Sequence, residues 1–232
     1  MASGPTSVPV HPDAAPYYAG SGPAGVLLCH GFTGSPRSMR GWAEHLVGEG
    51  FRVALPRLPG HGTSWQELNR TDWVDWYASV ERDFRTLRAE CATVFVAGLS
   101  MGGALAVRLA QRYPADVAGL ALVNPFLRSR DVRFRALSVL RHLNSLPGID
   151  GDIARPQTNE GAYSRVPLHA LHSLTKLWRI IEPDLGALDQ PLLLFRSRVD
   201  HVVDPSSAEL LLSTVGANDV TEVWLERSYH VA

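Results

Sequence analysis

The sequence predicts an α/β fold with a mostly parallel central sheet, flanking helices and a small inserted cap. Short apolar runs alternate with stretches of helical periodicity along most of the 232 residues. This pattern is typical of parallel strands joined by right-handed helical crossovers. Residues 125–188 interrupt the alternation and are predicted to be the cap. Hydrophobic residues form 45% of the chain and charged residues 19%, which favours a folded domain over disorder.

The beginning of the chain predicts a loose arm over residues 1–25, because five prolines stand there among glycine and serine. The arm has neither a cationic start nor the apolar run of a signal sequence, so we expect a cytoplasmic protein. No window of about 18 apolar residues is present, which predicts that no segment spans a bilayer. The formal net charge of -1 provides no field that would attract nucleic acid or an anionic membrane.

Six short apolar runs predict strands. The first of them, 26–29, has no periodicity, which is typical of a central parallel strand buried on both faces. The expected strands are 26–29, 51–55, 93–97, 117–123, 191–195 and 220–225. Apolar residues at helical spacing predict helices between them, over 36–47, 71–90, 101–112 and 206–212. The predicted domain organisation is a core of residues 1–124 and 189–232, with the cap of residues 125–188 inserted between two strands.

Two amphipathic helices are expected inside the predicted cap. One is centred on Leu137 and Leu140, and the other runs through residues 168–181. Five arginines also lie between positions 128 and 141. They predict a solvated face, with anion binding as the alternative.

A Gly-x-Ser-x-Gly motif, Gly98-Leu99-Ser100-Met101-Gly102, joins an expected strand to an expected helix. A nucleophile elbow requires this strand–turn–helix context. The turn is too tight for side chains at the two glycines, and it would project the Ser100 hydroxyl from the carboxyl edge of the sheet. Ser100 is therefore the candidate nucleophile of a hydrolase that works through an acyl-enzyme. The alternative is a glycine-rich turn without chemistry.

A serine hydroxyl needs a histidine to take its proton and a carboxylate to orient that histidine. In elbows of this type the acid and then the histidine follow the serine along the chain. The histidines after Ser100 are His142, His169, His172, His201 and His230. The first three fall in the predicted cap, and His201 directly follows the acid candidate Asp200. His230 follows the last expected strand by a short turn, so it is the predicted general base.

Two carboxylates, Asp200 and Asp204, follow the expected strand 191–195. Asp204 precedes Pro205 and Ser206 at an expected helix start, where an N-cap role explains it. Asp200 has no such explanation. We therefore predict that Asp200 orients the His230 imidazole and stabilises its protonated form, with Asp204 as the alternative.

The backbone N–H groups of Met101 and Phe32 are the predicted oxyanion hole. Met101 follows the nucleophile, and Phe32 lies in the loop after the first expected strand, which is where such donors are found. His30 is predicted to brace that loop through hydrogen bonds. His61 is predicted to organise the neighbouring loop, residues 56–63, in the same way.

Five segments lie in register with one known family: 30–36, 58–62, 98–103, 200–203 and 228–231. Through these motifs the sequence resembles bacterial monoacylglycerol lipases and their carboxylesterase relatives. The resemblance implies an α/β-hydrolase fold, no cofactor or metal, and hydrolysis of monoacylglycerols and other medium-chain or long-chain monoesters. By position it implies the triad Ser100, Asp200 and His230 and the oxyanion amides of Phe32 and Met101. A general short- to medium-chain carboxylesterase is the alternative, and a non-catalytic binding protein on the same fold is another.

The resemblance also implies a substrate-binding role for Glu160, because these lipases recognise the glycerol hydroxyls with a cap glutamate. The alternative is a solvated carboxylate. The implied partner is a small-molecule ester or monoacylglycerol; the sequence allows transient contact with a lipid surface through the cap and leaves the oligomeric state open. The family continues past its histidine into a helix packed on the sheet, whereas this sequence ends two residues after His230. A missing helix that left the His230 loop mobile would weaken general-base catalysis.

Overall fold

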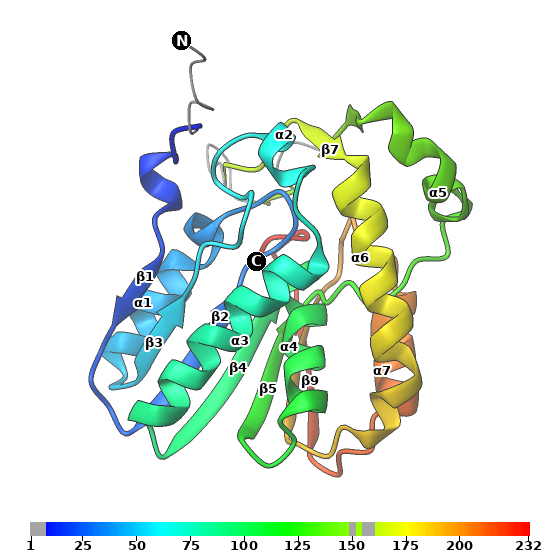
Figure 1. Cartoon of the computed structure of the whole chain (residues 1–232). Coiled ribbons are helices and arrows are strands. Elements are labelled where there is room, and N and C mark those ends of the chain that lie inside the picture. The colour runs from blue at the N-terminus through cyan, green and yellow to red at the C-terminus, as the bar shows by residue number, and fades with distance from the viewer. Residues whose placement is uncertain (1–7, 149–151, 155–160) are drawn as a thin grey trace.

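The computed structural model describes residues 8–148, 152–154 and 161–232, which form an α/β fold (Figure 1). Within these residues, seven strands form one sheet in the order β1-β3-β2-β4-β5-β8-β9. The strands are β1 Tyr17–Ala19, β2 Ala24–Cys29, β3 Arg52–Leu55, β4 Thr93–Leu99, β5 Val117–Val123, β8 Leu192–Ser197 and β9 Val220–Leu225. Neighbouring strands are parallel except β1 and β3. The predicted fold class and the six predicted strands are confirmed.

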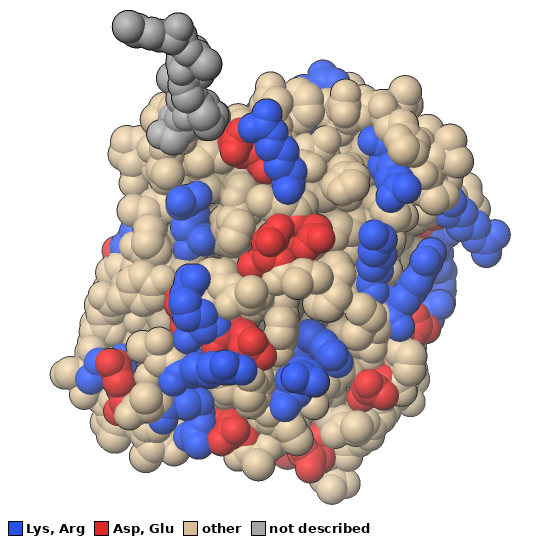
Figure 2. All heavy atoms as spheres, in the orientation of Figure 1, with Lys and Arg blue, Asp and Glu red and all other residues tan. Residues whose placement is uncertain are grey.

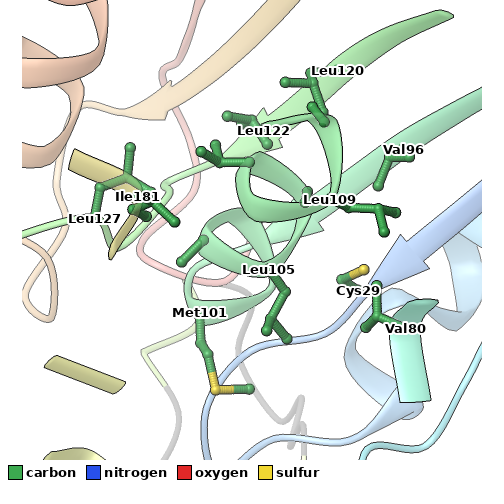
Figure 3. Packing of buried hydrophobic residues seen from close by; sticks show 14 of the residues in the cluster. Cys29, Val80, Val96, Met101, Leu105, Leu109, Leu120, Leu122, Leu127 and Ile181 are labelled. Atoms are coloured by element: carbon green, nitrogen blue, oxygen red, sulfur yellow. The ribbon is translucent and has the colours of Figure 1, made fainter. Parts of the chain in front are cut away.

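Both faces of the sheet are apolar, as the uninterrupted apolar runs predict. On β2, Leu27 and Cys29 belong to one buried cluster, whereas Val26 and Leu28 belong to a second cluster on the opposite face. Helices α3 (Trp73–Glu90), α4 (Met101–Arg112), α6 (Leu168–Ile181) and α7 (Ser206–Thr214) contribute to the first cluster. Figure 3 shows side chains of α4 packed among residues of β2, β4, β5 and α3. This helix therefore forms the centre of the core and fixes the turn that precedes it.

The second face is less completely covered within the described ranges. Helix α1 (Arg40–Gly48) packs against β3, and the short 3-10 helix η2 (Pro36–Met39) precedes it. Beside α1, an open groove of about 530 Å³ runs along β4, β5 and β8, and its lining includes Trp42, Phe95 and Leu193. The helical layers on the two faces are therefore unequal.

Three short elements outside the predicted cap were not predicted. Residues 17–19, which the sequence assigned to a loose arm, form β1 at the sheet edge, where Tyr18 Oη donates to Asp83 Oδ2 at 2.7 Å. The 3-10 helix η1 (Pro12–Ala14) precedes this strand, and Ala14 is buried. Helix α2 (Trp65–Leu68) begins after Ser64, whose hydroxyl accepts the N–H of Glu67. All three elements lack a long apolar run, so pattern alone did not indicate them.

Several short elements and one long helix form the described part of the predicted cap. They are η3 Val132–Ala136, α5 Leu137–Leu140, η4 Arg141–Leu143, β6 Ser145–Pro147, β7 Arg165–Pro167, α6 and η5 Glu182–Ala187. The predicted helix 168–181 is confirmed, and it packs against α3 and α4. Arg128, Arg130 and Arg133 form ion pairs with Glu182, Glu209 and Asp131, in agreement with a solvated face. The division into core and cap stays a prediction. In the described ranges, no helix is long and apolar enough to cross a lipid bilayer.

Candidate active site

Ser100 lies at the turn between β4 and α4, with φ +56° and ψ −118°. This left-handed backbone is unfavourable for serine and must be held by its surroundings. A Cβ at Gly98 would lie 2.3 Å from the Gly102 carbonyl oxygen, and a Cβ at Gly102 would lie 1.9 Å from the Cys29 carbonyl oxygen. Only glycine fits at these two positions, so the motif has the shape of a nucleophile elbow.

His230 and Asp200 are in direct contact at the carboxyl edge of the sheet. His230 Nδ1 lies 2.8 Å from Asp200 Oδ2, and both side chains are largely buried. Asp200 Oδ1 accepts the N–H groups of Val202 and Val203, each at 2.8 Å. This arrangement favours the proton on Nδ1 and leaves Nε2 as the base. Within the described residues no hydrogen bond joins His230 to the Ser100 hydroxyl, a contact that can tighten when substrate binds.

Asn124, which the sequence analysis missed, joins the segments that carry the site. Its Oδ1 accepts the N–H of Ser197 at 2.8 Å, and its Nδ2 donates to Ser197 Oγ at 2.9 Å and to the His230 carbonyl oxygen at 2.8 Å. The carbonyl oxygen of Val123, the residue before Asn124, accepts the Ser100 N–H at 3.0 Å. The end of β5 therefore holds both the elbow and the His230 turn. In the sequence, the position of Asn124 directly after the predicted strand 117–123 was the one signal that could have identified it.

The turn after β9, which carries His230, is anchored by hydrogen bonds. Asn124 holds the His230 carbonyl oxygen, and the Asp152 carboxylate accepts the His230 N–H at 3.1 Å. Val231 N–H donates to the Asp152 carbonyl oxygen at 3.0 Å, and Val231 forms a parallel bridge with Ile153. Side-chain and backbone bonds from two distant segments thus hold the histidine in place.

Asp204 has a different set of partners from Asp200. It accepts hydrogen bonds from the Ser206 N–H, the Arg130 N–H and the Ser129 hydroxyl. Burial raises the pKa of Asp204, but these hydrogen bonds outweigh burial and hold the pKa below its usual value. Asp204 therefore connects the start of α7 to residues 129–130. Of these two carboxylates, Asp200 is the one that contacts the His230 ring.

The two predicted oxyanion donors belong to the residue after Ser100 and to the loop that follows β2. Met101 is the first residue of α4, so its N–H has no acceptor within the helix. The loop that contains Phe32 passes close to the serine, since a Cβ at Gly31 would lie 3.5 Å from Ser100 Cβ. Within the described residues, neither N–H donates to another protein group. The oxyanion role of these two amides stays a prediction.

His30 and His61 form a buried, neutral pair beneath this loop. His30 Nδ1 donates to the Gly31 carbonyl oxygen at 3.0 Å, and His30 Nε2 accepts the Leu58 N–H at 3.2 Å. His61 Nδ1 donates to the Pro59 carbonyl oxygen at 3.0 Å, and the two imidazole rings lie 4.9 Å apart. Burial lowers the pKa of His30 to about 4 and that of His61 well below its ordinary value. The predicted bracing roles of both histidines are confirmed.

Tyr163, another residue that the sequence analysis missed, connects the predicted cap to both loops beside the site. Its hydroxyl donates to the Gly60 carbonyl oxygen and accepts the Thr63 N–H, each at 2.8 Å. Its N–H donates to the Thr33 carbonyl oxygen at 3.3 Å. Burial raises the pKa of the Tyr163 hydroxyl, which keeps it available as a donor.

The remaining candidate residues either do not join the Asp200–His230 pair or lie outside the residues that the structure describes. His142, His169 and His172 lie in η4 and α6. His201 contacts Asp152 instead of the Asp200–His230 pair. Glu160 lies outside the described residues. Within residues 8–148, 152–154 and 161–232, no group of three or more His, Cys, Asp or Glu side chains is arranged to hold a metal ion. The described groups are suited to nucleophilic attack assisted by a histidine.

Comparison with known proteins gives consistent matches. Residues 22–148 match the family described as serine aminopeptidase, S33. A thermostable monoacylglycerol lipase from Bacillus sp. (strain H-257) is 40% identical over 230 residues, 97% of this chain and 89% of that protein. A carboxylesterase from Bacillus subtilis (strain 168) is 26% identical over 93% of this chain and 88% of that protein.

Solved structures agree with these matches. A structure from a study of two metagenome-derived lipolytic enzymes, LipS and LipT, superimposes with a TM-score of 0.92 and 40% identity. It covers 97% of this chain and 92% of that chain. A monoacylglycerol lipase from Paleococcus ferrophilus superimposes with a TM-score of 0.76 at 19% identity, over 93% and 90% of the two chains. At that identity the second likeness concerns the fold alone.

Proposed function

Since this chain belongs to the family described as serine aminopeptidase, S33, we propose that it hydrolyses carboxylic esters through an acyl-enzyme on Ser100. One observation carries the proposal. The strained serine of a strand–helix elbow lies at the sheet edge where a buried carboxylate already orients a histidine, His230 Nδ1 to Asp200 Oδ2, at 2.8 Å. This is the arrangement that serine hydrolases need for general-base catalysis.

In the proposed reaction, Ser100 Oγ attacks the ester carbonyl carbon while His230 Nε2 takes the hydroxyl proton. The negative charge that forms on the carbonyl oxygen accepts hydrogen bonds from the N–H groups of Met101 and Phe32. Asp200 stabilises the protonated imidazole. The tetrahedral intermediate then collapses, and His230 gives its proton to the departing alcohol. Water, deprotonated by His230, attacks the acyl-enzyme. The bond to Ser100 Oγ then breaks, His230 returns the proton to Oγ, and the carboxylic acid is released.

The proposed substrates are monoacylglycerols, which would yield fatty acid and glycerol. The 40% identity to a thermostable monoacylglycerol lipase over 97% of the chain supports this choice. The carboxylesterase relative supports the alternative of a general short- to medium-chain esterase. Glu160 would bind the glycerol hydroxyls in the first case. Hydrolysis rates on 1-monoacylglycerols and on methyl esters of the same acyl length distinguish a monoacylglycerol lipase from a general esterase. Only an enzyme that recognises glycerol should hydrolyse the 1-monoacylglycerols faster.

Labelling and mutation of Ser100 test the chemistry. A fluorophosphonate probe is expected to label the purified protein at Ser100, and Ser100→Ala is expected to abolish both labelling and p-nitrophenyl ester turnover while the melting temperature changes little. A protein that does not react with the probe is the non-catalytic binding protein on this fold. Esterase activity that persists in the Ser100→Ala variant contradicts the assignment of the nucleophile.

We also propose that the predicted cap contacts lipid surfaces, where such substrates lie. Three aliphatic residues on η3, α5 and η4 are largely exposed: Val132 by 69%, Val139 by 71% and Leu143 by 61%. Arg133 and Arg135 are exposed on the same short elements, and Figure 2 shows Lys and Arg side chains gathered over the side of the molecule that carries α5 and α6. Aliphatic residues among cations fit an anionic bilayer surface. The cytoplasmic location stays a prediction.

A further inference from the structure

Asp152 lies in the predicted cap, 78 positions before His230 in the sequence, yet its carboxylate contacts the turns that carry both the acid and the histidine. One carboxylate oxygen, Oδ2, accepts the N–H of His201 at 3.0 Å and the N–H of His230 at 3.1 Å. His201 directly follows Asp200. A single oxygen atom therefore joins the backbone beside the acid to the backbone of the base.

The other polar atoms of Asp152 strengthen the same connection. Its Oδ1 lies 2.7 Å from His201 Nδ1, and its carbonyl oxygen accepts the Val231 N–H at 3.0 Å. The next residue, Ile153, forms a parallel bridge with Val231. Asp152 is thus bonded to the acid turn by its side chain, and to the histidine turn by both its side chain and its backbone.

Burial and charge indicate that these bonds are strong. The Asp152 side chain is only 7% exposed, and a buried carboxylate is costly unless donors surround it. Burial raises the pKa of Asp152, but hydrogen bonds from His201 and from the His230 amide outweigh burial and lower it. The carboxylate therefore stays ionised and accepts charge-assisted hydrogen bonds from the two amides.

The backbone of His230 has no helix or strand to hold it, because it lies in the irregular turn after β9. Its carbonyl oxygen is bonded by Asn124 Nδ2 and its N–H by Asp152 Oδ2. Asp200 orients the ring but does not bond the main chain of His230. Two side chains thus bond the main chain of His230 directly, while Asp200 orients its ring.

We propose that Asp152 is a positioning residue, which holds the His230 backbone at the place where Asp200 orients the imidazole toward Ser100. This inference rests on the proposed ester hydrolysis. It makes the predicted cap a structural part of the general-base machinery, in addition to any role in binding substrate. Displacement of reacting groups by about 1 Å can cost about 100-fold in rate, so a small shift of this turn is sufficient to lower kcat.

Three substitutions separate position from charge. Asp152→Asn keeps the size of the side chain, and its carbonyl oxygen can replace Oδ2 as acceptor of both amides. We expect its kcat on p-nitrophenyl butyrate to stay within about threefold of wild type. Asp152→Ala removes the acceptor, and Asp152→Glu keeps the charge but moves the acceptor by one methylene. We expect both to lower kcat by about tenfold to 100-fold, with KM changed less than about twofold.

Asp131→Asn is the matched control, because Asp131 is also a carboxylate of the predicted cap and, among the residues that the structure describes, its side chain accepts hydrogen bonds from Arg133 alone. We expect wild-type kcat in this variant. The rate of fluorophosphonate labelling at Ser100 is measured for every variant, together with the melting temperature and the pH profile of kcat/KM. We expect slower labelling in the Ala and Glu variants at temperatures well below their melting, and an unchanged pH profile in the Asn variant.

The outcomes separate this inference from the proposed function. Absence of turnover and of labelling in the wild-type protein contradicts the ester hydrolase itself. With an active wild type, the positioning role is overturned by wild-type kcat in a folded Ala or Glu variant. It is also overturned by an Asn variant that loses activity to the same extent, shifts the pH profile or fails to fold, since the Asn side chain keeps the acceptor. If the Ala variant does not fold, the contrast between Glu and Asn decides.

Discussion

Glycine is required at position 102 because the backbone of β2 lies too close for a side chain, and not because of the backbone conformation at this position. Its missing side chain leaves room for the Cys29 carbonyl oxygen, which would lie 1.9 Å from a Cβ. We expect Gly102→Ala to prevent stable folding or to lower the melting temperature severely, because α4 would have to move away from the sheet. Gly41→Ala is the control, since a Cβ there has no neighbour within 4 Å. In helix α1 it should raise stability by about 0.5–1 kcal/mol. Equal melting temperatures would contradict this account of the elbow.

Asp200 contacts the His230 imidazole, whereas Asp204 connects the start of α7 to residues 129–130. Substitution by Asn should therefore affect catalysis at Asp200 and stability at Asp204. In Asp200→Asn the side-chain oxygen can keep the N–H groups of Val202 and Val203, which places the amide NH2 where Oδ2 faces His230 Nδ1. An NH2 group at that place favours the wrong His230 tautomer, and in comparable triads this costs about 10⁴-fold in kcat. Asp204→Asn weakens bonds to Ser129, Arg130 and Ser206, so we expect it to lower the melting temperature with a much smaller loss of kcat. Steady-state kinetics on one p-nitrophenyl ester measures both. A greater kcat loss in Asp204→Asn would reverse the assignment of the acid.

The residues that sequence could identify are those whose chemistry requires a local motif. Ser100 has its flanking glycines, and Asp200 and His230 have a fixed order after expected strands. Asn124, Asp152 and Tyr163 could not be identified in the same way. Their partners are mostly main-chain groups, which any residue supplies, and these partners lie 73, 78 and 103 positions away. Only the folded chain brings such pairs together.

The exposed aliphatic side chains of α5 and η4 support a prediction about lipid binding. Val139→Asp combined with Leu143→Asp should weaken binding to phosphatidylglycerol vesicles about tenfold or more, because two aliphatic groups no longer enter the bilayer surface. Turnover of water-soluble p-nitrophenyl butyrate should not change. Val74→Asp is the control, as Val74 is 51% exposed on α3. Vesicle sedimentation at low salt measures the binding, and equal binding by the double variant and the control would exclude this surface.

Secondary structure was predictable where burial imposes a pattern. The six parallel strands lie between helical layers or beside an apolar groove, so each requires an apolar run. Strand β1 lies at the sheet edge and pairs through its backbone, so it does not require an apolar run, and the sequence around Tyr17 and Tyr18 contains none. The amphipathic helix expected around Leu137 is short in the structure: α5 covers four residues between the 3-10 helices η3 and η4. Asn144, with φ +66°, ends this stretch.

The stability of the entire protein should depend on pH through the buried imidazoles of His30 and His61. In the unfolded chain a histidine binds a proton near pH 6.5, whereas burial keeps His30 neutral until the pH reaches about 4. The unfolded state therefore binds more protons in this range, and stability falls as the pH decreases from about 6.5 to about 4. Carboxylates with lowered pKa values, such as Asp152 and Asp204, contribute only at lower pH.

Melting temperatures between pH 8 and pH 4.5 test this dependence. We expect a plateau above about pH 7 and a continuous fall below it, and a shallower fall in His30→Asn, which has no imidazole to titrate. His142→Gln, at an exposed position of η4, should keep the wild-type slope. A constant melting temperature from pH 7 to pH 5 would contradict the neutral, buried state of the pair.

The bonds of Asn124 also bear on folding kinetics. They join β5 to residues 73 and 106 positions later in the chain, and contacts of such long range form slowly. Trp76 is fully buried in the core of the first sheet face. In an active variant that keeps Trp76 as its only tryptophan, out of the six in the sequence, fluorescence reports collapse of the layer formed by α3 and α4. During refolding from urea, recovery of ester hydrolysis should therefore lag behind the change in tryptophan fluorescence. The length of that lag measures how slowly the last strand docks beside β8.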